Sequence, residues 1–305
     1  MVAFASLDGR PVEASREAVS WTDTGVVHIQ ATAAPVDYSG TGTLLYSGRH
    51  VLTAAHIAEN MAIGDIVAFH TADGQSVFTV PVGSVTLHPG WSRTTAEDDI
   101  AILTLATEAP TWAIRHDINR NGGEIGQMFK ITGYGVAGNG QGEYPDDPFF
   151  PTKREGLNRY DAISEDGELL FYDFDSGNAA NDAGALLNAP DLGLGPREAN
   201  ATRGDSGGPG LLLSDDGTHV LSGVVSHGLS GLRTDIDPEP DSSFGELTAE
   251  TRVSAYADWI DTLVQGSATV AAPAPAPAAP AEPLAFVPAS EDWMAPGREL
   301  GGEWM

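Results

Sequence analysis

Short apolar stretches recur through the first part of the chain, each bounded by Gly, Asp or Ser. They occupy residues 25–29, 42–46, 77–80 and 100–105. Such stretches are too short for most helices, and the turn residues that separate them are typical of strands in a β-sandwich or barrel. We therefore predict a β unit over residues 21–116.

A second set of apolar stretches follows at residues 129–135, 210–213 and 220–226. It predicts a second β unit over residues 117–266. The polar segments 138–161 and 173–203 interrupt this unit, and compact domains keep segments of that length mainly as functional or insertion loops. We expect surface loops at both places.

Helical periodicity appears near the end of the second unit, within residues 250–265. The apolar positions on one face are Val253, Tyr256, Ile260, Leu263 and Val264, with Trp259 at the edge. This spacing predicts one amphipathic helix that packs on the β core.

The two ends of the chain differ from the β units. Residues 1–20 form an N-terminal segment that we interpret as propeptide-like. Residues 267–283 are dominated by Ala and Pro, which predicts an extended linker. Residues 284–305 form an acidic tail that contains tryptophan, and both a disordered tail and a docking or export signal are open interpretations. We expect folding and turnover to need only the residues up to Ser267.

Charge and composition narrow the classes of function. The 305 residues include 15 basic and 43 acidic side chains, for a net charge of −28. Because such a surface repels phosphate backbones and anionic lipids, nucleic acid is excluded as a partner.

The absence of cysteine excludes disulfides, thiolate catalysis and Cys-ligated metals. No apolar run approaches the roughly 18 residues of a membrane span.

A serine on a glycine-rich turn is the first candidate for chemistry. Ser206 lies within residues 203–209, between a polar segment and an apolar strand. Glycines leave the backbone N–H groups of such a turn unobstructed, so a substrate can approach closely. A simple turn is the competing interpretation.

Serine needs a base and the base needs a carboxylate. His56 ends the apolar run 51–56, whose small residues would bury one side of the ring. Asp99 directly precedes the apolar strand 100–105 and should point inward, whereas Asp98 should point to the other side. Taken singly, a structural histidine and a solvated carboxylate are the competing interpretations.

Together these motifs, in the order His, Asp, Ser, resemble the trypsin/chymotrypsin family of serine endopeptidases. The resemblance covers residues 21–266, and residues 133–135 and 222–228 support it. It implies an all-β fold of two six-stranded Greek-key β-barrels of the chymotrypsin type with a C-terminal helix. It also implies catalysis through a triad and an acyl-enzyme intermediate.

The resemblance assigns roles to individual residues. His56, Asp99 and Ser206 would form the catalytic triad, and the N–H groups of Gly204 and Ser206 would form the oxyanion hole. The substrate-binding residues would be Asn200, Ser226 and Gly228.

Two departures from the family pattern change the expectations. Trypsin-specific members have aspartate where this chain has Asn200, so a preference for Arg or Lys is not expected. The family's activating sequence does not precede Trp21, so another group must satisfy Asp205, or processing is unconventional.

The resemblance leaves two other functions open, a catalytically silent protease homologue that acts as a binding module and an esterase that uses the same triad. It implies protein or peptide substrates and a secreted, extracellular or periplasmic location, and we expect a monomer.

No cofactor is required for this chemistry, but two acidic segments have spacings found in calcium loops. The first contains Asp173, Asp175, Asn178 and Asp182, and the second contains Asp235, Asp237 and Asp241. Neither reproduces a full calcium-loop pattern. The favoured interpretation is solvated acidic loops.

Overall fold

The computed structural model describes residues 3–4, 20–32, 38–143, 152–213, 218–266 and 303–304. The predicted linker lies outside the described residues, as does all of the tail except two residues. Of the N-terminal segment, Ala3–Phe4 and Ser20 are described. No helix in the described part is long and apolar enough to cross a membrane.

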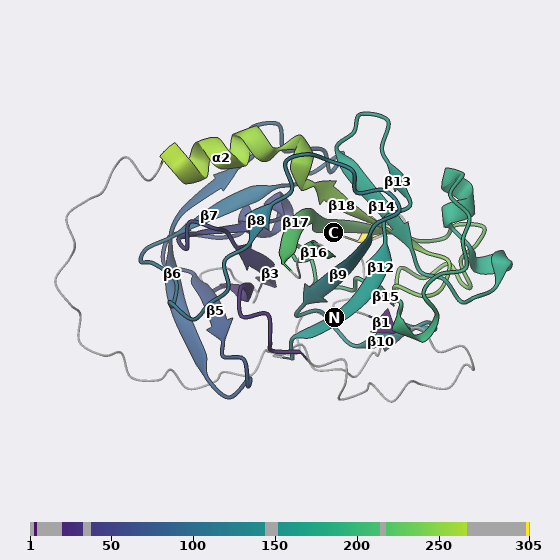
Figure 1. Ribbon diagram of the computed structural model, residues 1–305, viewed down its shortest axis with the longest axis horizontal. Coiled ribbons are helices and arrows are strands. Elements are labelled where there is room, and N and C mark those ends of the chain that lie inside the picture. Colours follow the sequence, from purple (N-terminus) through teal and green to yellow (C-terminus); the bar gives the residue numbers. More distant parts are fainter. Residues whose placement is uncertain are drawn as a thin grey trace.

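The first β unit is a closed barrel with the strand order β2-β3-β4-β7-β6-β5 (Figure 1). Its strands are β2 (Val26–Ala31), β3 (Tyr38–Leu44), β4 (His50–Thr53), β5 (Ile66–His70), β6 (Val77–Leu87) and β7 (Ala101–Leu105). Strand β7 pairs with β4 and β6, and its Ile102, Leu103 and Leu105 are buried in the hydrophobic core.

The second unit is a nine-stranded sheet with the main path β12-β9-β16-β17-β18-β14-β13, from which β8 and β19 pair with β17. Its strands are β8 (Asp117–Ile118), β9 (Met128–Gly133), β12 (Arg154–Arg159), β13 (Ala162–Ile163), β14 (Leu169–Asp173), β16 (Pro209–Leu213), β17 (His219–Leu229), β18 (Leu247–Arg252) and β19 (Glu303–Trp304). A small sheet joins β1 (Ala3–Phe4), β10 (Gly138–Asn139), β11 (Gly142–Glu143) and β15 (Ala199–Asn200). The predicted all-β chymotrypsin-type fold is confirmed, with one closed barrel and one half-barrel.

Two predicted elements are corrected by the structure. The expected loop 138–161 contains β12, a polar strand whose partner β9 supplies the pairing that its sequence does not reveal. The expected loop 173–203 holds β15 and three short 3₁₀ helices, η1 (Ala179–Asn181), η2 (Gly184–Leu187) and η3 (Gly195–Arg197).

The C-terminal helix begins later than predicted. Residues 247–252 form β18, which pairs with β17 and β14, and the turn η4 (Val253–Ala255) separates it from α2 (Ala257–Gly266). Helix α2 lies along the first barrel (Figure 1), and its Ile260 and Val264 share that barrel's hydrophobic core. The helix therefore packs on the first barrel, although the second unit directly precedes it in the sequence.

Glu250 of β18 carries a buried carboxyl group inside the second unit. Its Oε2 accepts a hydrogen bond from the Tyr160 hydroxyl at 2.5 Å. Burial raises the pKa of Glu250 to about 8, although the hydrogen bond from Tyr160 opposes the shift. In the unfolded chain this carboxyl group titrates near pH ~4. The contribution of Glu250 to the free energy of unfolding is therefore fully present below that pH, and it is lost as the pH rises through about 8.

We expect Glu250→Gln to reduce this loss of stability at alkaline pH. The neutral amide has nearly the same shape and needs no proton to stay uncharged. Between pH 6 and pH 9 the wild-type melting temperature should fall by several degrees more than that of the variant, since ~1 kcal/mol corresponds to about 2–4 °C. Thermal unfolding followed by circular dichroism measures both slopes. Equal slopes would show that Glu250 does not titrate in this range.

Candidate active site

His56 and Asp99 meet inside the first barrel. His56 lies in the short helix α1 (Ala55–Ala58), which directly follows β4, and Asp99 lies just before β7. The His56 Nδ1 atom is 2.7 Å from Asp99 Oδ2, and the His56 backbone N–H donates to Asp99 Oδ1 at 2.9 Å. Since β4 and β7 are paired neighbours, the sheet itself fixes this carboxylate–imidazole pair.

The backbone around Asp99 turns its carboxylate inward. Asp98 has a φ of 54°, and its own carboxylate points elsewhere, 3.1 Å from His88 Nδ1. Thr251 of β18 donates a hydrogen bond to the Asp99 carbonyl at 2.9 Å. The two adjacent acids therefore face different surroundings, as the sequence predicted.

A bulge in β17 adds a third group to this pair. The β17–β18 register shifts between Val225 and His227, so Ser226 lies at the irregularity. A bulge re-aims the side chain that it carries. The Ser226 hydroxyl donates to Asp99 Oδ2 at 2.6 Å.

Asp99 is fully buried and yet held in its charged form. Burial by itself would raise the pKa of Asp99. His56 and the hydrogen bonds from Ser226 and the His56 backbone outweigh that effect and hold the pKa below its usual value. A carboxylate of this kind can orient an imidazole and stabilise its cation.

The turn that carries Ser206 packs against the segment leading to His56. Gly207 has a φ of 79°, and a Cβ atom there would lie 2.0 Å from Thr53 Oγ1 and 3.0 Å from the Ala54 nitrogen. The Thr41 backbone N–H donates to the Ser206 carbonyl at 2.9 Å. Only glycine allows this close approach, which joins the two units beside the histidine.

The backbone around Ser206 presents donors of the kind that an oxyanion hole requires. Gly204 has a φ of 93°, a conformation that favours glycine. Within the described residues, the N–H groups of Gly204 and Ser206 donate to no protein acceptor. They are therefore available to a ligand oxygen.

Asp205 is a fully buried carboxylate held by its neighbours. Its Oδ1 accepts the Gly135 N–H at 2.9 Å, and its Oδ2 accepts the backbone N–H and the hydroxyl of Thr202 at 2.9 and 3.1 Å. These bonds fix the loop between Thr202 and Ser206. They supply partners for Asp205 that the sequence did not reveal.

Asn200 and Gly228 come together through the strands around them. Gly228 of β17 lies opposite Thr248 of β18, and the Thr248 hydroxyl donates to Asn200 Oδ1 at 2.6 Å. Asn200 Nδ2 is buried and has no hydrogen-bond partner among the described residues. Sequence reasoning missed Thr248, because only the cross-strand pairing places it beside Asn200.

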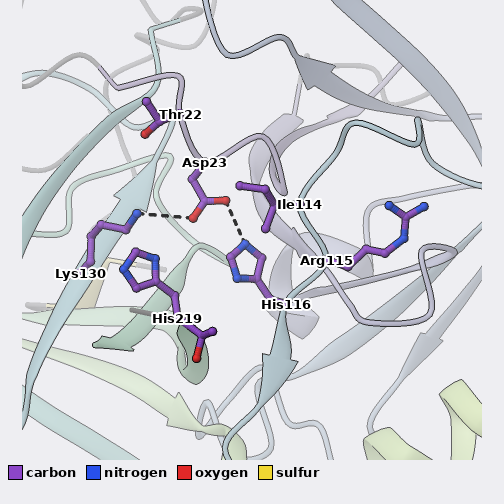
Figure 2. A pocket seen from close by; sticks show the side chains of 8 residues that line it. Thr22, Asp23, Ile114, Arg115, His116, Lys130 and His219 are labelled. Atoms are coloured by element: carbon purple, nitrogen blue, oxygen red, sulfur yellow. Dashed lines mark hydrogen bonds and ion pairs between the residues drawn. The ribbon is translucent and has the colours of Figure 1, made fainter. Parts of the chain in front are cut away.

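A cavity of about 420 Å³ lies elsewhere, lined by Thr22, Asp23, Ile114, Arg115, His116, Lys130, Thr218 and His219 (Figure 2). None of the predicted site residues lines it. Asp23 contacts His116 Nε2 at 2.9 Å and Lys130 Nζ at 3.5 Å. Burial would raise the pKa of Asp23, but His116 and Lys130 lower it, so this cluster is an internally paired ion network.

Comparisons with known proteins agree with this geometry. A trypsin family model matches residues 19–148. Chymotrypsin-C of Bos taurus is 26% identical, and the match covers 73% of this chain and 78% of that protein. Trypsin Tyr p 3.0101 of Tyrophagus putrescentiae is 27% identical over 75% of this chain and 73% of that protein.

A further relative, venom serine protease Bi-VSP of Bombus ignitus, is 29% identical over 61% of this chain and 51% of that protein. Among solved structures, mouse neuropsin, a serine protease, is 19% identical and has a TM-score of 0.57, with 81% of this chain and 97% of that chain covered. That likeness supports the fold. The family model and the named relatives together support the trypsin-like family of serine endopeptidases for this chain.

Proposed function

We propose that the chain hydrolyses peptide bonds through a triad of His56, Asp99 and Ser206 and an acyl-enzyme intermediate. The observation that carries this proposal is the buried Asp99 carboxylate, 2.7 Å from His56 Nδ1. That bond leaves Nε2 as the nitrogen that exchanges a proton with substrate and serine.

In the first half of the reaction, Ser206 Oγ bonds to the carbonyl carbon of the peptide and gives its proton to His56. The N–H groups of Gly204 and Ser206 stabilise the oxyanion, and one such donor contributes about 2.7–4 kcal/mol in comparable sites. His56 then returns the proton to the leaving amine as the C–N bond breaks. Water repeats these steps on the ester and releases the acid.

A fluorophosphonate probe tests this assignment directly. The expected result is one covalent adduct per chain, mapped by mass spectrometry to the peptide that contains Ser206, together with cleavage of casein. A silent binding module would give no adduct. An esterase would be labelled and would cleave nitrophenyl esters but not casein.

The pocket side of the site favours uncharged side chains before the cleaved bond. Asn200 offers an amide group where the tryptic members have an anion, and the Thr248 hydroxyl donates to its Oδ1 atom. Asn200→Asp should therefore raise the ratio of kcat/KM for an Arg substrate over a Leu substrate at least ~10-fold, a change of ~1.4 kcal/mol. Thr248→Val, which removes the hydroxyl without adding charge, is the matched control and should not favour Arg. An Arg preference in the wild type would contradict this interpretation.

The chain's own C-terminus lies on the edge that would bind the substrate main chain. Trp304 and Glu303 of β19 pair antiparallel with Gly228 and Leu229 of β17. A substrate must displace β19 from this edge before it can bind. Because the edge is free for only part of the time, the apparent affinity for substrate is weaker.

A chain that ends at Ser267 should consequently show a KM lowered at least ~2-fold, with kcat unchanged. Its melting temperature should stay within about 4 °C of the wild type, the shift that ~1 kcal/mol produces in a domain of this size. Steady-state kinetics on a peptide substrate measure the effect. An unchanged KM would mean that β19 does not compete with substrate.

We propose protein or peptide substrates and a secreted, extracellular or periplasmic enzyme. The family match and the relative named as a venom protease support this location. Fractionation of cells that express the full chain tests it.

A further inference from the structure

Three aspartates form a compact group where β14 ends. Asp173 is the last residue of β14, Asp175 follows two residues later, and Asp182 caps the end of η1. One carboxylate oxygen from each residue lies within 4.8 Å of those from the other two. We call these three residues the acidic cage.

The acidic cage is buried, which corrects the expectation of a solvated loop. Asp173, Asp175 and Asp182 are 4%, 2% and 5% exposed. Asn178, which the sequence grouped with them, instead accepts the Ala180 N–H and caps η1. The sequence pattern therefore identified the three aspartates correctly, but the prediction that they are solvated was wrong.

Two of the three carboxylates are fixed by backbone donors. The Gly184 N–H donates to Asp173 Oδ2 at 2.7 Å, and the Ala185 N–H donates to Asp182 Oδ1 at 2.7 Å. Asp175 is different, because both of its carboxylate oxygens are buried and have no hydrogen-bond partner within the described residues. A buried carboxylate without a partner is costly unless it binds a cation or a proton.

No basic side chain in the described ranges pairs with the acidic cage. Arg159 pairs with Asp191 instead, at 2.8 Å. Glu198, also buried, adds a further carboxylate close by and accepts the Asp175 N–H at 2.8 Å. Burial and these neighbouring acids raise the pKa of Asp175 to about 10.

We propose that Asp173, Asp175 and Asp182 bind one calcium ion. The oxygens of Asp175 supply the unpaired ligands, and the backbone donors hold the other two carboxylates in place. This binding site does not depend on the proposed triad.

The ligand set and its spacing favour calcium over other divalent ions. Calcium binds oxygen at ~2.3–2.6 Å, so opposite ligands on one ion lie about 5 Å apart, which fits oxygens within 4.8 Å of one another. Magnesium binds at ~2.0–2.1 Å and usually keeps several waters, for which a cage this buried is poorly suited. The cage has no nitrogen or sulfur ligand of the kind that zinc prefers.

An ion at the acidic cage would lie close in sequence to the proposed substrate pocket. The segment from Asp175 to Glu198 leads into β15, which carries Asn200 beside the proposed substrate pocket. Asn181 also donates to the Thr234 carbonyl at 2.8 Å and so ties this segment to the second acidic loop. An ion at the cage would therefore stabilise two loops near the pocket.

Calcium titration of the chelator-treated full chain tests the proposal. We expect one ion per chain by isothermal titration calorimetry. At a calcium concentration of 100 times Kd, the melting temperature should rise by about 5–11 °C. An absence of both heat and stabilisation in the wild type would overturn the site, and an equal response to magnesium would overturn its assignment to calcium.

Matched variants locate the ion. Asp175→Asn keeps the size of the side chain, replaces the carboxyl group that would bind calcium with a neutral amide, and should abolish the calcium response while melting close to the wild type in chelator. Asp182→Asn should weaken the calcium affinity at least ~10-fold as an independent check. Asp237→Asn removes one charge from the second acidic loop and should leave the response intact. A full response in Asp175→Asn, or its loss in Asp237→Asn, would place the ion elsewhere.

Discussion

Replacing Ser206 by alanine is expected to lower kcat for peptide hydrolysis by ~10⁶-fold, the loss seen when a triad of this type loses its nucleophile. In the proposed mechanism the Ser206 hydroxyl forms the covalent bond, and neither His56 nor Asp99 replaces it in that role. Substrate binding should change little, because Asn200, Ser226 and Gly228 remain in place. The residual rate should still exceed the uncatalysed one, since the Gly204 and Ser206 N–H groups persist.

The measurement is kcat and KM on a peptide substrate, combined with fluorophosphonate labelling of the same preparations. Ser222→Ala is the matched control, because this buried serine lies on β17 but donates to the Gly210 carbonyl, away from Asp99. The control should keep its activity within a few-fold and its labelling. Normal labelling of Ser206→Ala would exclude Ser206 as the nucleophile.

The sequence was informative wherever chemistry follows from local pattern. His56 closely follows the apolar strand β4 and Asp99 closely precedes the apolar strand β7, and these two strands are neighbours in the closed barrel. The glycines around Ser206 are required by close contacts and by positive φ values, which a sequence signals directly. Local order along the chain was therefore enough to select the candidate triad.

The sequence was less informative wherever pairing between distant strands decides the environment. Thr248 reaches Asn200 only because β18 lies opposite Gly228, and Glu250 is buried only because β18 lies between β14 and β17. The helical spacing that begins at residue 250 was a coincidence that this pairing overrides. Burial of Asp175 depends in the same way on a long irregular segment that folds back over β14.

Asp99→Asn is expected to lower kcat/KM by ~10⁴-fold while the chain stays folded. Asp99 accepts hydrogen bonds from three donors, namely the His56 backbone N–H, the His56 ring and the Ser226 hydroxyl. An asparagine NH₂ must face at least one of these donors. If it faces the ring, the imidazole adopts the tautomer that carries its proton on Nε2 and cannot accept the proton of Ser206.

The cost in stability should be modest in comparison with the loss of activity. One unsatisfied buried donor costs ~1–3 kcal/mol, which corresponds to about 2–12 °C in melting temperature. Asp98→Asn is the neighbouring control, because that carboxylate contacts His88 and not His56. It should keep its activity within a few-fold. Kinetics and thermal melts of both variants separate the two effects, and an Asp99→Asn enzyme with more than a tenth of the wild-type kcat/KM would show that this carboxylate does not orient the catalytic base.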